Sequence, residues 1–138
     1  MSVLKDLAKQ IHENARNKGF WDKERNVGEM LMLIVSEVSE AMEADRTNNY
    51  YDALTRYRVD KDLTQNGSRW SFNVVDNNDE AWLNWFRSEV KNSFADELAD
   101  AMIRIMDLAH SKNIDLEWHI KAKMRYNASR PHMHGKKY

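Results

Sequence analysis

The chain has 138 residues, of which 31% are charged and 42% hydrophobic, and its formal net charge is -1. This length fits a single domain, residues 1–138, with a substantial core. The nearly balanced charge does not indicate binding to a nucleic-acid polymer or an anionic membrane. The absence of cysteine excludes disulfide scaffolds, thiolate zinc sites and cysteine nucleophiles. No apolar run reaches the length of a membrane span and the N-terminus lacks a signal-peptide core, so a cytoplasmic protein is expected.

The sequence predicts long helices, because it has only 4 Gly and 1 Pro. The first helix is expected to follow a Ser2 cap and to run to about Lys18, where Gly19 ends it. The second follows a capping box that begins at Asn26 and runs to about Arg46.

Two more helices are expected in the C-terminal part of the chain. Ser93 caps a helix that ends near Lys112, and Asp115 caps a last helix. The last helix must end before Pro131, and the basic tail from His132 onward is expected to be irregular.

Residues 47–92 are the least regular part and are interpreted as an aromatic-rich insertion between the second and third core helices. An alternating, strand-like pattern is formed by Trp70, Phe72 and Val74. Helical spacing returns at Trp82, Trp85, Phe86 and Val90. The insertion could be a lid, a base-recognition element or an oligomer contact, although packing is the favoured role for most of its aromatic residues.

Two short acidic repeats interrupt the apolar helical stretches. Glu37 and Glu40 lie three positions apart in one, and Glu97 and Asp100 in the other. Three positions are nearly one helical turn, so the two acids of each pair point the same way. On the first helix this is also the face of Met30, which an amphipathic helix should bury.

Buried carboxylates need a partner or a metal, and no basic partner for these four acids is obvious from the pattern. Carboxylate oxygens suit Mg²⁺, with Mn²⁺ also possible, and the sequence therefore favours a divalent-cation site. Two nulls compete. A single Glu-x-x-Glu is more often a solvated face, but two such pairs beside apolar residues favour a site. A carboxylate di-iron bundle requires Glu-x-x-His, which is absent at both pairs.

Mg²⁺ bound by a few carboxylates is typical of phosphate-ester or anhydride chemistry. Basic side chains should then grip the phosphates, and the available candidates are Arg104, Lys123, Arg130, Lys136 and Lys137. Trp21 could stack on a base, although ordinary packing is its favoured role.

The chain resembles the MazG-like all-α nucleoside triphosphate pyrophosphohydrolases. The resemblance is carried by the two acid pairs, by the run from Ala101 to Leu108 that follows the second pair, and by the segments Lys123–Pro131 and His134–Lys137. It covers the two flanks of the chain and not residues 47–92, where the interval between the acid pairs is longer than in compact members.

The resemblance implies a four-helix core and the Mg²⁺- or Mn²⁺-dependent hydrolysis of a nucleoside triphosphate, for which a dNTP is the expected substrate, to the monophosphate and pyrophosphate. The metal ligands and catalytic residues would be Glu37, Glu40, Glu97 and Asp100. Lys123 and Asn127 would contact phosphate or sugar, and a metal-activated water would be the nucleophile. Members of the family form homodimers or homotetramers with sites near subunit interfaces and remove excess or non-standard nucleotides.

Two other readings remain open. The chain could be a non-catalytic helical interaction module, for which the aromatic-rich insertion is the motive. It could also be a metal-dependent hydrolase of another phosphoanhydride or of a phosphodiester, which shares the same metal chemistry.

Overall fold

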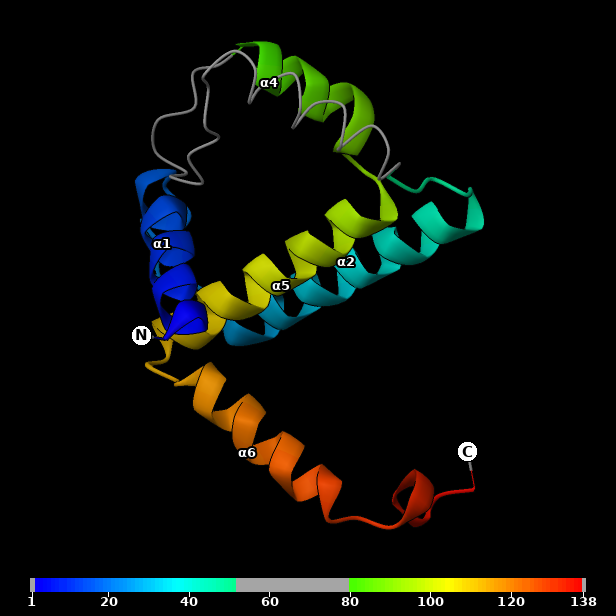
Figure 1. Ribbon diagram of the computed structural model, residues 1–138. Coiled ribbons are helices and arrows are strands. Elements are labelled where there is room, and N and C mark those ends of the chain that lie inside the picture. Colours follow the sequence, from blue (N-terminus) through cyan, green and yellow to red (C-terminus); the bar gives the residue numbers. More distant parts are fainter. Residues whose placement is uncertain (1, 52–79, 138) are drawn as a thin grey trace, which may run out of the picture.

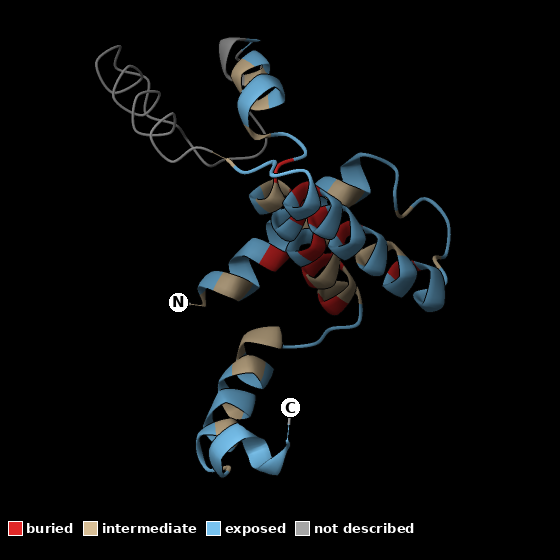
Figure 2. Cartoon of the chain, turned by 90° about the vertical axis from the view of Figure 1, so that its right-hand side faces the viewer, coloured by how far each residue is buried: buried red, intermediate tan, exposed pale blue. Residues whose placement is uncertain are grey.

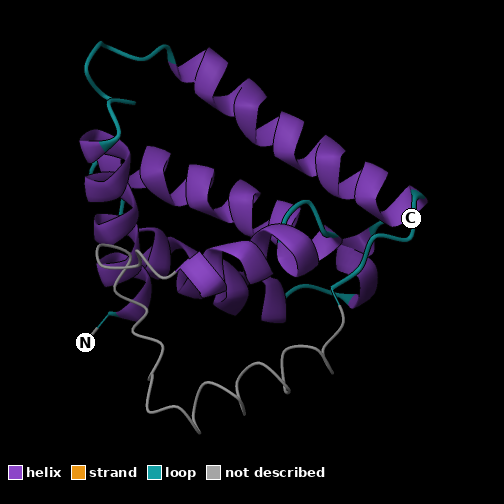
Figure 3. Cartoon of the chain, turned by 90° about the horizontal axis from the view of Figure 1, so that it is seen from above, coloured by secondary structure: helices purple, strands orange, loops and turns teal. Residues whose placement is uncertain are grey.

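The computed structural model describes residues 2–51 and 80–137, and every regular element in these ranges is helical. This confirms the all-α prediction for the described residues (Figure 3). The α-helices are α1 (Val3–Asn17), α2 (Val27–Arg46), α4 (Glu80–Trp85), α5 (Phe94–Ser111) and α6 (Leu116–Ala128). A π-helical stretch (Phe86–Val90) continues α4, and a 3₁₀ turn (His132–Gly135) lies in the tail.

The helix boundaries follow the predicted capping signals. Each of the four predicted caps accepts a hydrogen bond from the backbone N–H three residues later, and these caps are Ser2, Asn26, Ser93 and Asp115. Gly19 has a φ of +84°, the left-handed conformation expected of a residue that terminates a helix.

The packing is centred on α5, which lies against both α2 and α1 (Figure 1). The α2 and α5 helices run antiparallel, as the colours of Figure 1 show. Their adjoining ends are tied together, because Phe94 N–H donates to the Asn49 carbonyl at 2.9 Å and the Asn49 amide donates to the Asn92 carbonyl at 2.8 Å. Buried residues gather where α1, α2 and α5 meet (Figure 2).

The α6 helix extends away from this packed centre (Figure 1) and has no buried residue. It packs chiefly against α1. Glu117 in its first turn accepts hydrogen bonds from Lys121 and from Ser2, both at 2.5 Å, and these bonds lower the pKa of Glu117 to about 2. The first turn of α6 is therefore its anchored end.

Part of the interpretation of residues 47–92 can be compared with the structure. The helical spacing from Trp82 to Val90 is confirmed by α4 and the π-helical stretch that follows it. The strand-like pattern of Trp70, Phe72 and Val74 lies outside the described residues. None of the described helices is long and apolar enough to cross a membrane.

The buried face of α5 differs in one respect from the periodic pattern. Helical spacing places Leu98 and Ala101 on one arc of α5, but Leu98 is 44% exposed while Ala101 is buried. The reason is that α5 is packed on two sides, by α2 and by α1, so its buried residues do not form one stripe.

Ser93 caps α5, the helix that carries the second acid pair, so its substitution tests how much this cap stabilises the helix. It is 1% exposed, and its Oγ accepts from the Asp96 N–H at 3.3 Å. We expect Ser93→Ala to lower the free energy of unfolding by about 1 kcal/mol, measured by urea denaturation. Ser39→Ala is the matched control, because the exposed Ser39 hydroxyl only donates to a carbonyl of its own helix. Equal effects of the two substitutions would contradict the assigned role of the cap.

Candidate functional site

The two acid pairs meet across the packed faces of α2 and α5. Carboxylate oxygens of Glu37, Glu40 and Glu97 all lie within 4.8 Å of one another. Glu37 and Glu40 are one turn apart on α2, and Glu97 comes from the first turn of the antiparallel α5. Together these three residues form the acid cluster.

Two members of the acid cluster are buried. Glu37 is 8% exposed and Glu97 is 4% exposed, whereas Glu40 is exposed to solvent. Glu97 has neither a hydrogen-bond partner nor an ion-pair partner within the described part of the chain. A largely buried carboxylate without a partner loses much of its hydration without compensation, so this position is electrostatically unfavourable as it stands.

The pKa of Glu97 reflects this unfavourable position. Burial raises its pKa above the ordinary value of 4.5, and the nearby charges of Glu40 and Asp100 raise it further. The charged side chains that shift its pKa are all acidic, namely Glu40, Asp100, Asp96 and Glu37. The acid cluster therefore concentrates negative charge in a poorly hydrated space.

Asp100 lies beside the acid cluster and not within it. It is half-buried, and its pKa is raised by burial and by the charges of Asp96 and Glu37. Asp100 and Glu37 both line a cavity of about 300 Å³ between α1, α2, α5 and the segment that joins α1 to α2. The fourth predicted acid thus faces this cavity at the edge of the cluster.

The expectation that the acids have no basic partner is wrong for Glu37. Arg104 on α5 donates from Nε to Glu37 Oε1 at 2.5 Å. Arg104 lies one turn after Asp100, which places it on the side of α5 that meets α2. The sequence predicted Arg104 as a phosphate contact, and in the structure its guanidinium is paired with a predicted metal ligand.

Asp107 and Arg25, which also line the cavity, form a second polar cluster with His12 and Trp21. Asp107 is buried and accepts from the Trp21 indole N–H at 3.1 Å, and its Oδ1 lies 2.7 Å from His12 Nδ1. The guanidinium of Arg25 lies 3.9 Å from Asp107 and over the Trp21 ring at 5.4 Å. These contacts hold the α1–α2 connection against α5. Trp21, proposed as a base-stacking residue, is half-buried here and hydrogen-bonded to Asp107.

Sequence analysis missed this second polar cluster. Asp107 stands in the apolar run Ile105-Met106-Asp107-Leu108, and a lone acid in such a run is a signal of buried hydrogen bonding. Its partners His12 and Trp21 come from 86 or more positions away in the sequence, so spacing gave no sign of them.

The acid cluster has the donors and the dimensions that a small divalent cation needs. Mg²⁺ binds oxygens at about 2.0–2.1 Å, so two oxygens on opposite sides of one ion lie about 4.2 Å apart. Three oxygens on one octahedral ion include at least two pairs at right angles, whose members lie about 2.9 Å apart, so oxygens within 4.8 Å of one another must approach by up to about 2 Å. Glu40 can make this adjustment because it is exposed. The residues present therefore fit an oxygen-ligated cation, with Glu37, Glu40 and Glu97 as its holders.

The predicted phosphate contacts on α6 and in the tail do not lie with the acids in this chain. Lys123 and Arg130 both approach the ring of Tyr126, with the Lys123 Nζ at 4.9 Å from its centroid and the Arg130 Cζ at 5.7 Å. The Asn127 Oδ1 is buried and has no hydrogen-bond partner in the described part of the chain. Lys136 is exposed. None of these four residues lines the cavity beside Glu37 and Asp100.

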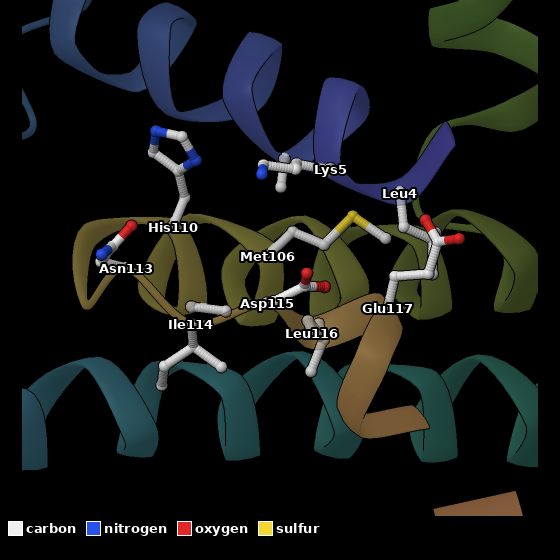
Figure 4. Close-up of a pocket in the computed structure, with 11 residues that line it drawn as sticks. Leu4, Lys5, Met106, His110, Asn113, Ile114, Asp115, Leu116 and Glu117 are labelled. Atoms are coloured by element: carbon white, nitrogen blue, oxygen red, sulfur yellow. The ribbon is translucent and has the colours of Figure 1, made fainter. Parts of the chain in front are cut away.

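A smaller cavity of about 110 Å³ lies between α1, the end of α5 and the start of α6 (Figure 4). Met106 extends into the space between α1 and the α5–α6 connection in this view, and Glu117 lies at one end of it. No residue predicted for the site lines this cavity. It is a packing gap at the base of α6, separate from the acids.

Comparison with protein-family models, with curated proteins and with solved structures gives no match to this chain.

The raised pKa values of Glu97 and Asp100 predict a pH dependence of stability in metal-free buffer. As the pH rises from 4.5 through the raised pKa, the unfolded chain releases a proton that the folded chain still holds, so the folded state loses stability. Glu97→Gln should remove much of this loss and stabilise the metal-free protein at pH 7 by about 1–2 kcal/mol, with a smaller gain at pH 5.

Urea denaturation between pH 5 and pH 8 measures this effect. Glu24→Gln is the matched control, since Glu24 is exposed in the α1–α2 connection. A Glu97→Gln protein whose stability curve runs parallel to that of the wild type would contradict the assignment of Glu97 as a buried, unpaired acid.

Proposed function

We propose that this protein is a Mg²⁺-dependent nucleoside triphosphate pyrophosphohydrolase of the MazG-like class, acting on the cytoplasmic nucleotide pool. The observation that carries the proposal is Glu97, a buried carboxylate without a partner that meets two further carboxylates. Such a cluster is stabilised by a divalent cation, and Mg²⁺ is the hard cation that works with carboxylates and substrate phosphates together.

The cavity beside the acids supports an anionic substrate of small size. Its volume of about 300 Å³ is at the lower end of ligand pockets, and Arg25 and Arg104 line it together with Asp100. Guanidinium groups match the oxygen geometry of phosphate. A net charge of -1 gives no broad basic surface for a polymer, so a free nucleotide is the favoured substrate and a dNTP the expected one.

The proposed roles of the residues follow from their positions. Glu37, Glu40 and Glu97 would hold the ion, and Asp100 would complete the acid set from the side of the cavity. When bound, the ion supplies positive charge to the phosphates and lowers the pKa of an attacking water. Water would attack one phosphorus of the α–β anhydride and bond to it through its oxygen. The bond from that phosphorus to the bridging oxygen would break, and a proton of the water would pass to solvent, which leaves the monophosphate and pyrophosphate. Arginine side chains at the cavity would orient the phosphate chain.

The proposed architecture is a four-helix MazG-like core of α1, α2, α5 and α6, with residues 47–92 as an insertion between α2 and α5. Support comes from the capped boundaries of these four helices and from the antiparallel pairing of the two helices that carry the acids.

The protein is proposed to work as a homodimer or a larger homo-oligomer. One side of α2, away from its core face, carries four exposed apolar residues at helical spacing, and these are Leu31, Val35, Val38 and Met42. Single exposed apolar residues are ordinary, but a continuous stripe marks an interaction surface. The neighbouring α5 adds two further exposed apolar residues, Leu98 at 44% and Met102 at 42% exposure.

A second copy of the chain would also account for α6. Lys123 and Asn127 lie on a helix that buries no residue and extends away from the acids of its own chain. In the proposed oligomer, Lys123 of one subunit reaches the acid cluster of another. Each active site then draws its metal ligands and its phosphate contacts from different subunits.

The exposed apolar stripe also favours a second candidate function, that of a non-catalytic helical interaction module. The two functions differ in their response to metal. A module of this kind predicts that Mg²⁺ leaves the melting temperature unchanged, whereas the hydrolase predicts a rise that depends on Glu37 and Asp100.

Pyrophosphate release from a panel of NTPs and dNTPs with Mg²⁺ or Mn²⁺ tests the proposed activity. Glu40→Ala should reduce the rate by at least about 100-fold, because loss of even an outer-shell partner costs 10–100-fold. Glu43→Ala is the matched control, since Glu43 lies one turn further on the same helix in an exposed ion pair with Arg46. Release of no pyrophosphate from any nucleotide would refute the hydrolase.

Mixed oligomers test the shared active site. Lys123→Ala and Glu97→Gln subunits, each inactive alone, should regain about a quarter of wild-type activity when refolded together as dimers, because half of the pairs are mixed and each mixed pair has one intact site. The control mixture of Glu97→Gln with Glu40→Ala damages the acids of both subunits and should stay inactive. An inactive Lys123→Ala and Glu97→Gln mixture would contradict the shared site.

A further inference from the structure

Arg104 stands between the acid cluster and the adjoining cavity. It lines that cavity beside Glu37 and Asp100, and it also lines a smaller gap of about 20 Å³ beside Arg25 and Met30. Its side chain is 37% exposed, while the Glu37 side chain that it contacts is 10% exposed. The Arg104 side chain is thus partly exposed to the cavity while its guanidinium contacts a buried carboxylate.

The contact between Arg104 and Glu37 occupies one oxygen of a carboxylate that the proposed cation would also use. Arg104 Nε lies 2.5 Å from Glu37 Oε1, and the acid cluster requires a carboxylate oxygen from Glu37. Two cations cannot both approach one carboxylate closely without repelling each other. A divalent ion held by Glu37 and a guanidinium on the same carboxylate are therefore in competition.

Arg104 also places a positive charge beside Asp100 as well as Glu37. Its charge lowers the pKa of Asp100, which burial and the neighbouring acids otherwise raise. Four acids with one guanidinium still leave an excess of negative charge. The pairing thus offsets part of the repulsion between the acids without removing the need for a further cation.

We propose that Arg104 is an internal counter-ion that holds Glu37 in the metal-free protein and moves to the phosphate chain of the substrate when the divalent cation binds. This inference rests on the proposed metal site. The long arginine stem allows the guanidinium to turn into the cavity that it already lines, where a phosphate offers two oxygens to its planar donors. Arg104 then weakens the binding of metal alone and strengthens the binding of metal together with a polyphosphate.

Titration of Mn²⁺ into the full chain, followed by the electron paramagnetic resonance signal of free Mn²⁺, tests the competition. Arg104→Gln should bind Mn²⁺ about tenfold more tightly than the wild type, the size of effect that one adjacent charge has on a neighbouring ionisation. Arg104→Lys keeps the charge but not the Nε donor and should fall between the two. Arg125→Gln, which removes an exposed positive charge on α6, is the matched control and should match the wild type.

The second half of the test uses inorganic triphosphate as the probe. With Mn²⁺ saturating, Arg104→Gln should bind triphosphate at least about tenfold more weakly than the wild type. Equal or weaker Mn²⁺ affinity in Arg104→Gln, or unchanged triphosphate affinity, would overturn the counter-ion role while leaving the metal site intact. Absence of Mn²⁺ binding in the wild type and in all of the variants would instead refute the proposed metal site.

Discussion

The burial of Glu37 and Glu97 between α2 and α5 is the constraint on which the rest of the arrangement depends. Both acids lie on faces that the apolar residues around them require to be packed, so the helices cannot pair without drawing the carboxylates together. Bringing like charges into a poorly hydrated space costs free energy, and the raised pKa of Glu97 reflects that cost. A cation bound between the carboxylates would offset this cost. The free energy of packing α2 against α5 and the free energy of binding a cation would therefore depend on each other.

The neighbouring contacts keep the helices in place despite this cost. The bonds between Asn49 and the start of α5 join the C-terminal end of α2 to the N-terminal end of α5, and the Asp107 cluster fastens the α1–α2 connection near the other end of α5. Arg104 offsets part of the charge from within the site. The acids are thus held together by packing and tethers that do not involve a ligand, which is the preorganisation that a cation site needs.

The sequence was sufficient for the helices and for the grouping of the acids, because capping and helical spacing are local properties. Asn26 and Ser93 began their helices as predicted, and three of the four predicted acids came together. Contacts between distant segments were beyond its reach. Arg104 follows Asp100 by one helical turn, but its pairing with Glu37 depends on how α5 meets α2. Asp107 was passed over because its partners lie on α1 and on the connection after it. The positions of Lys123 and Asn127 relative to the acids depend on the direction of α6, which no local pattern sets.

The central claim is that the meeting point of Glu37, Glu40 and Glu97 is a divalent-cation site. Anomalous X-ray scattering from crystals of the full chain grown with Mn²⁺ tests it most directly. The account predicts an anomalous peak among these three carboxylates, with Arg104 displaced from Glu37, and no such peak in Glu97→Gln crystals. A peak confined to other residues, or acids that remain metal-free with Arg104 still on Glu37, would contradict it.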